Sequence, residues 1–94
     1  MAKYEMLYLL NNDLSDEAKT AEIEKYENIV KSMGGNVVST DKWGTKKLAY
    51  PIKFKSEAYY VLMTFEANGE VIKELDRVAG ISSDMLRRMV TKIN

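Results

Sequence analysis

The period at which apolar residues recur changes several times along this chain, and the order of those changes restricts the folds that it can adopt. Lys3–Asn11 alternates with a period of two between largely apolar faces, which is typical of a central strand. From Ser15, a good N-cap residue, apolar residues recur every three or four positions until Gly34-Gly35. The glycine pair is a helix stop, so the first third of the chain predicts a strand followed by a helix.

The middle of the chain predicts two further strands. Asn36–Phe54 is extended, and Gly44 marks a bulge or bend within it. Pro51 has no N–H to donate to a neighbouring strand, so this strand is expected at a sheet edge. Lys55–Glu57 reads as a short connection into Ala58–Ala67, which has the strongest strand composition in the chain.

The last third repeats the pattern with a shorter helix over Glu70–Ala79, stopped by Gly80, and a strand over Met85–Ile93. The order β-α-β-β-α-β predicts an α+β, ferredoxin-like sandwich occupying residues 1–94 as a single domain. Right-handed crossovers place both helices on one face of a four-stranded antiparallel sheet, with the first and third strands in the middle. The opposite face of the sheet is then left open.

Composition excludes much catalytic chemistry, because the chain contains neither cysteine nor histidine. Thiolate nucleophiles, Cys/His zinc sites and imidazole-dependent catalysis are therefore impossible. Carboxylate pairs lie on helix faces predicted to be exposed, and no phosphate-cradling loop is present. No apolar run approaches the roughly 18 residues that span a bilayer. We therefore expect that the protein is not an enzyme and has no catalytic residue. We also expect that it binds no metal, cofactor, small-molecule substrate or membrane.

The net charge of zero hides an uneven distribution. Residues 1–41 hold four lysines against eight acidic residues, and residues 42–94 hold ten basic against six acidic residues. Lys42–Lys55 contains five lysines and no acid, interleaved with Trp43, Tyr50 and Phe54. Lysines pair with phosphates and rings stack on unpaired bases, so the segment suits an RNA surface. The alternative is a solvated edge strand whose rings belong to the core.

A second surface feature follows from strand alternation. If Tyr4, Met6, Tyr8 and Leu10 face the helices, apolar residues of the other parity lie on the open face of the sheet. A contiguous apolar patch usually marks a protein interface. The residues expected there are Leu7, Leu9, Tyr60, Leu62 and Met89.

Residues Trp43–Ile52, which read WGTKKLAYPI, resemble the segment W-G-x-[KR]-[KR]-L-A-Y-x-I of the bacterial small-subunit ribosomal protein S6 family. The resemblance covers nearly the whole chain. It includes Lys3-Tyr4-Glu5, Gly35-x-Val37, Tyr59-Tyr60 and Leu86-Arg87-x-Met89-Val90.

This resemblance implies a non-catalytic component of the cytoplasmic ribosome. It would bind the central domain of the small-subunit ribosomal RNA together with small-subunit ribosomal protein number eighteen (S18). The residues carried over by position as RNA-binding candidates are Lys3, Lys46, Lys47, Tyr50, Arg87 and Lys92. Arg87 is the firmest, because its planar fork suits phosphate or stacking better than a lysine does. The alternative is a ferredoxin-like homodimerisation or ligand-sensing module without RNA binding.

Overall fold

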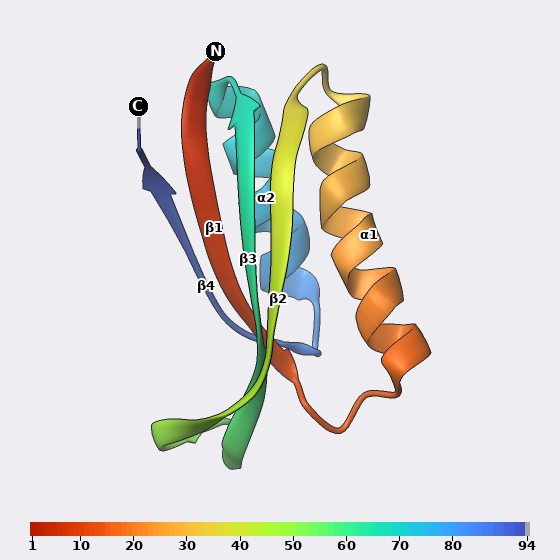
Figure 1. Ribbon diagram of the computed structural model, residues 1–94, viewed down its shortest axis with the longest axis vertical. Helices are drawn as coiled ribbons and strands as arrows, with labels where there is room; N and C mark the ends of the chain where they lie inside the picture. The colour runs from red at the N-terminus through yellow and green to blue at the C-terminus, as the bar shows by residue number, and fades with distance from the viewer. Residues whose placement is uncertain (94) are drawn as a thin grey trace.

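The computed structural model of the protein describes residues 1–93, and its elements follow the predicted order (Figure 1). The elements are β1 (Ala2–Asn11), α1 (Asp16–Ser32), β2 (Asn36–Ile52), β3 (Lys55–Ala67), α2 (Gly69–Ile81) and β4 (Met85–Lys92). All neighbouring strands are antiparallel, in the spatial order β2-β3-β1-β4. Both helices lie on one face of the sheet, so the predicted ferredoxin-like architecture is confirmed.

The main core fills the space between the helices and the sheet. It uses the strand parity predicted from the sequence: Met6, Tyr8 and Leu10 of β1 are fully buried. They meet buried residues of β3 and the apolar stripes of both helices. The remaining core members include Val61, Met63, Phe65, Ile23, Tyr26, Val30, Val71, Leu75 and Ala79. This packing leaves the alternate residues of the central strands on the opposite face.

The two ends of α1 are fixed by the residues expected to cap it. The Ser15 hydroxyl oxygen accepts a hydrogen bond from the Ala18 N–H at 3.1 Å. Gly34 follows the helix with a φ of +86°, a conformation that L side chains rarely adopt. Gly35 permits a close approach, because a Cβ there would lie 2.8 Å from the Glu66 carbonyl oxygen. Neither helix in the described residues is long and apolar enough to cross a membrane.

The turn between β2 and β3 differs from the expectation. Ile52 pairs with Lys55, so the connection consists of only two residues, Lys53 and Phe54. Their φ values are +50° and +64°, the left-handed geometry of the tight hairpin turns that match strand twist. The expected strand through Phe54 and connection over Lys55–Glu57 are therefore wrong. Lys55–Glu57 belong to β3 because their partners across the hairpin extend the pairing.

Smaller differences occur elsewhere. The structure places Gly80 inside α2, which ends at Ile81, because glycine can also adopt helical geometry.

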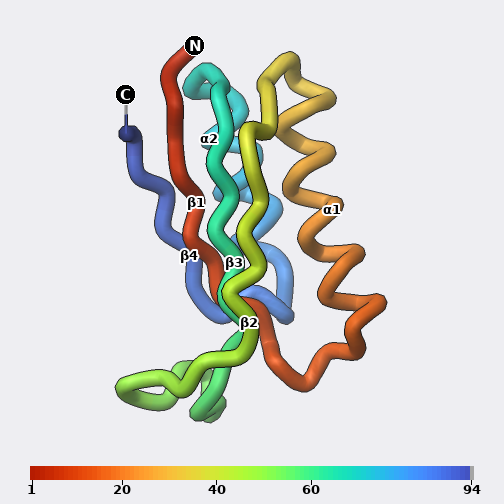
Figure 2. The backbone as a smooth tube through the Cα atoms, viewed as in Figure 1, coloured from red at the N-terminus to blue at the C-terminus, as the bar shows by residue number. Residues whose placement is uncertain are grey.

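Pro51 lies on the edge strand β2, as predicted. β2 and β3 extend beyond the rest of the sheet as a two-stranded arm (residues 46–57) that bends away from the sheet axis (Figure 2). Leu48 and Ile52 of the arm pack against a second small cluster, formed by Leu9, Ala58 and Leu86.

Candidate functional site

The sheet face opposite the helices, here called the open face, carries apolar residues on three adjacent strands. Leu7 of β1 lies directly opposite Leu62 of β3 on one side and Met89 of β4 on the other. Met89 is 49% exposed, whereas Leu7, Tyr60 and Leu62 are half-buried. The structure thus brings together residues that the sequence placed on this face.

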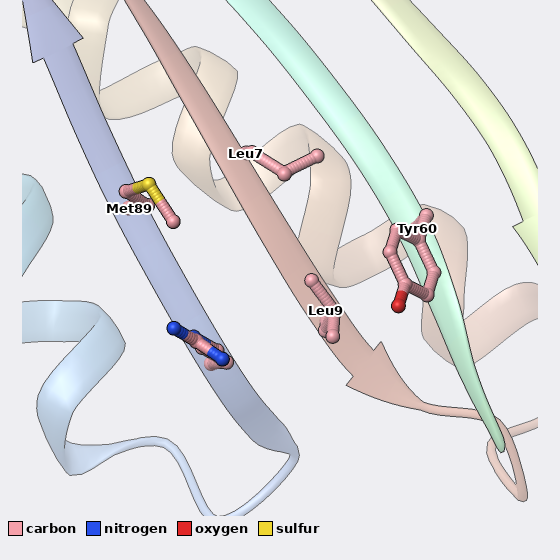
Figure 3. Close-up of a pocket in the computed structure, with 5 residues that line it drawn as sticks. Leu7, Leu9, Tyr60 and Met89 are labelled. Carbon is pink, nitrogen blue, oxygen red and sulfur yellow. The ribbon is translucent and has the colours of Figure 1, made fainter. Parts of the chain in front are cut away.

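Two shallow hollows share Leu7 and Met89. The first, of about 190 Å³, is completed by Leu9, Tyr60 and Arg87. Figure 3 shows Leu7 and Leu9 on β1, between Met89 of β4 and Tyr60 of β3. The second hollow has a volume of about 230 Å³. It is lined by Glu5, Leu7, Trp43, Leu62, Met89 and Thr91.

Leu9 is the one member of the expected apolar patch that is buried. Its exposed fraction is 5%, because it packs with Ala58 and Leu86 beneath the arm. It forms part of the floor of the first hollow rather than its rim. Sequence alternation gives the face of Leu9, but the bend of the arm that covers it depends on tertiary packing.

Trp43 is a member of this face that the sequence prediction did not include. Its ring stacks on that of Tyr60, with centroids 6.5 Å apart and planes inclined by 12°. The Lys46 Nζ lies 5.8 Å from the centre of the Trp43 ring, within the range of a cation–π contact. A register shift between Lys42 and Gly44 redirects the strand at this point. The sequence feature that could have indicated this change of direction is the bulge expected at Gly44, whose φ is +87°.

Tyr50 and Arg87 meet although 37 positions separate them. The Arg87 Nη1 donates a hydrogen bond to the Tyr50 hydroxyl oxygen at 3.0 Å. A second register shift, between Leu9 and Leu10 on β1, leaves Leu86 as an extra residue on β4. Because of it, Leu86 packs in the second cluster and its neighbour Arg87 lines the first hollow. Lys46, Trp43, Tyr60, Tyr50 and Arg87 therefore form a cationic and aromatic group at the arm end of the open face, here called the arm-end group.

The other RNA-binding candidates lie elsewhere. Lys47 follows Lys46 along β2 and so points to the other side of the strand, opposite Glu57. Lys3 and Lys92 lie at the far end of the sheet, roughly 20 Å from the arm-end group, given about 3.4 Å per strand residue. Lys3 shares the parity of Leu7, whereas Lys92 pairs with Tyr4 and shares the parity of the helix-covered face.

Charge is graded along the open face. Basic groups gather at the arm end, where Arg87 and Lys46 lie. Carboxylates lie further along: Glu5 lines the second hollow, and Asp41 pairs with Leu62 across β2 and β3. The arm end of the apolar centre is therefore cationic, whereas the other end carries mainly carboxylates, with Lys3 as a cation beyond Glu5.

The buried titratable groups are tyrosines of the core. The Tyr8 hydroxyl is the sole buried side-chain polar atom without a hydrogen-bond partner in the described part of the chain. Burial raises the pKa of Tyr8, and also that of Tyr26, well above their ordinary values. The Tyr26 hydroxyl donates to the Glu22 carboxylate at 3.2 Å. Residues 1–93 contain no group of three or more side chains of metal-ligating type placed to hold an ion.

Comparisons with known proteins identify relatives of this chain that match it over nearly its whole length. The family model described as "Ribosomal protein S6" matches residues 3–92. "Small ribosomal subunit protein bS6" of Caldanaerobacter subterraneus subsp. tengcongensis is 42% identical over 92 residues, covering 98% of this chain and 97% of the relative. The protein of the same name from Clostridium botulinum strain Hall is 44% identical over 90 residues, covering 96% of each chain.

Solved structures agree on the fold. The crystal structure of 30S ribosomal protein S6 from Thermotoga maritima superposes with a TM-score of 0.93 at 20% identity. The match covers 98% of this chain and 87% of that one. An uncharacterized protein from Thermotoga maritima matches with a TM-score of 0.64 at 13% identity, covering 99% of this chain and 98% of the other.

Proposed function

The chain belongs to the ribosomal protein S6 family, and from that membership we propose that it binds the central domain of the small-subunit ribosomal RNA jointly with S18. Its general role is that of a structural, non-catalytic component of the small subunit of the cytoplasmic ribosome. The observation that carries the RNA assignment is the arm-end group, in which cations and aromatic rings from β2, β3 and β4 meet.

The chemistry of the arm-end group fits RNA. Arg87 is oriented by the Tyr50 hydroxyl, and a planar guanidinium can hold a phosphate with two parallel hydrogen bonds. Lys46 adds a second cation nearby, and exposed rings can stack on unpaired bases. Lys47, Lys3 and Lys92 extend this proposed surface around the strand edges and toward the far end of the sheet.

The chemistry of the apolar centre fits a protein partner. Leu7, Leu62 and Met89 leave apolar area in water on three adjacent strands, and such patches mark interfaces. Glu5 and Asp41 beside them favour a partner that brings positive charge to that end. A basic partner seated there would add its own phosphate contacts next to those of Arg87, so the two proteins would bind RNA as one connected surface.

Salt dependence tests the RNA assignment. We expect Lys46→Ala and Arg87→Ala each to weaken binding of a central-domain RNA fragment by the protein–S18 pair. Each should also lower the slope of log affinity against log salt by about 0.7–0.9, since one phosphate contact is lost. Lys73→Ala, an exposed lysine on α2, is the matched control and should change neither quantity. Lys47→Ala reports whether the RNA also reaches the other side of β2.

Two results would count against RNA binding by the arm-end group. If Lys46→Ala and Arg87→Ala bind with the affinity and slope of Lys73→Ala, the arm-end group is only a solvated strand edge. A concentration-dependent homodimer without RNA affinity, measured by sedimentation, would instead favour a self-association module.

A further inference from the structure

The tip of the arm places one aromatic ring entirely in solvent. Phe54 is 102% exposed, more than any other large apolar side chain among the described residues. It is the second residue of the two-residue turn between β2 and β3. Neither of the two aromatic–aromatic pairs of the core nor the Trp43–Tyr60 stack involves it.

The backbone at this tip is also unfavourable for a residue with a Cβ. Lys53 and Phe54 both have positive φ, where Asn-Gly is the preferred pair. Glycine at position 54 would adopt the positive φ of the turn more easily. Such a change would lose no buried apolar area, because Phe54 is fully exposed. Non-glycine residues with positive φ are concentrated at functional sites, so Phe54 is a candidate functional residue.

The turn is anchored on both sides, so the backbone that carries the ring is fixed in position. The Lys53 Nζ donates to the Met85 carbonyl oxygen at 3.0 Å, at the start of β4. The Lys55 Nζ forms an ion pair with the Asp13 carboxylate, which lowers the pKa of Asp13. Met85 is two residues from Arg87, so the tip and the arm-end group belong to the same end of the molecule.

The surroundings of the ring select the kind of partner. Lys53 and Lys55 flank Phe54, and the polar hollow beside it has a volume of about 160 Å³. That hollow is lined by Asn11, Asn12, Asp13, Phe54, Lys55, Ser56 and Glu57. A protein pocket for a phenyl ring is apolar, whereas an unpaired base offers an aromatic surface on a strand of phosphates. Asp13 neutralises Lys55, but Lys53 forms no ion pair with a described residue and keeps its positive charge beside the ring. Proteins bind single-stranded nucleic acid with such a combination of a cation and an exposed aromatic ring.

We propose that Phe54 is a base-stacking residue, which receives an unpaired base of the RNA whose phosphates contact the arm-end group. This inference rests on the proposed function and adds a recognition element to it. The ring supplies stacking without base identity, since every base has an aromatic face. The anchored turn limits the loss of conformational freedom when the base binds.

Three substitutions at this position test the proposal on the protein–S18 pair, with the central-domain RNA fragment as probe. Phe54→Leu keeps an apolar side chain, Phe54→Gly removes it, and Phe54→Tyr keeps a ring. Loss of one stacked base corresponds to about 5- to 150-fold in affinity. We expect that loss for Phe54→Leu and Phe54→Gly and a change within about twofold for Phe54→Tyr, the scale of a retained stack. Because no cation is removed, the salt slope should stay unchanged in all three variants.

Stability and partner binding serve as controls. Phe54→Gly should unfold at a higher urea concentration than the parent protein, because glycine fits the positive φ, so its lower RNA affinity cannot be due to misfolding. Phe54→Leu binding within twofold of the parent would overturn the proposal. So would a loss confined to S18 binding, which would show a protein contact. RNA binding by neither parent nor variants would instead refute the proposed function itself.

Discussion

At the scale of single residues, side-chain direction decides which groups can act together. Lys46 and Lys47 look equivalent in sequence, but they project from opposite sides of β2. Conversely, Tyr50 and Arg87 are remote in sequence and form a hydrogen bond. The residue types of the candidate site could be predicted from the sequence. Their grouping could not, because it depends on two register shifts and on the bend of the arm.

The Tyr8 hydroxyl gives a stability prediction at this scale. It is fully buried and lacks a partner, and an unsatisfied buried polar group costs about 1–3 kcal/mol. We expect Tyr8→Phe to raise the free energy of unfolding by about 1 kcal/mol, measured by urea denaturation.

Tyr26→Phe is its matched control. Tyr26 is equally buried, but its hydroxyl donates to Glu22, so removal should lower the free energy of unfolding by about 1 kcal/mol. A Tyr8→Phe protein less stable than its parent would show that the hydroxyl has a partner, such as an internal water molecule.

At the scale of elements, the fold was predictable because several independent signals agree. Apolar period, the Ser15 cap, the glycines after α1 and the position of Pro51 all indicate the same arrangement of strands and helices. The hairpin turn was the exception, because Lys53-Phe54 carries none of the residues that usually mark a turn with positive φ. Its position follows from the pairing of β2 with β3 instead.

The junction of α1 with β2 gives the prediction at this scale. A Cβ on Gly35 would lie 2.8 Å from both the Glu66 carbonyl oxygen and the Val30 Cγ1. The helix end must shift away from β3 to admit it, so Gly35→Ala should lower the free energy of unfolding by about 1–3 kcal/mol. Thermal or urea unfolding measures the difference.

Gly69→Ala at the start of α2 is the control for that substitution. Apart from its chain neighbours and the nearby backbone of its own helix, no heavy atom lies within 4 Å of its Cβ position, and its φ is not positive. It should therefore leave stability unchanged or raise it by about 0.4–1 kcal/mol, since alanine restricts the unfolded chain. Equal effects of the two alanines would contradict the packing described for Gly35.

At the scale of the whole molecule, the two helices cover one face of the sheet and leave the other face open. The open face combines an apolar centre with cations at one end and mainly carboxylates at the other. A nearly neutral chain of this kind can neutralise only a few phosphates, so electrostatics alone gives affinities of about 10⁻⁴–10⁻⁶ M for RNA. We propose that high affinity comes from a second protein bound to the apolar centre, and this joint binding is the central claim.

Titration of the central-domain RNA fragment with the protein alone, with the protein–S18 pair, and with a Met89→Asp pair tests that claim most directly. Met89 is 49% exposed and lines both hollows, so Met89→Asp should fold yet place an unpaired charge in the interface. Ile81→Asp, at a 74% exposed position at the end of α2, is the control.

We predict weak binding by the protein alone and tight binding by the pair. That gain should be retained in Ile81→Asp and reduced at least about 100-fold in Met89→Asp, the effect of roughly 3 kcal/mol. Tight binding by the protein alone, or an undiminished gain in a folded Met89→Asp variant, would contradict the account.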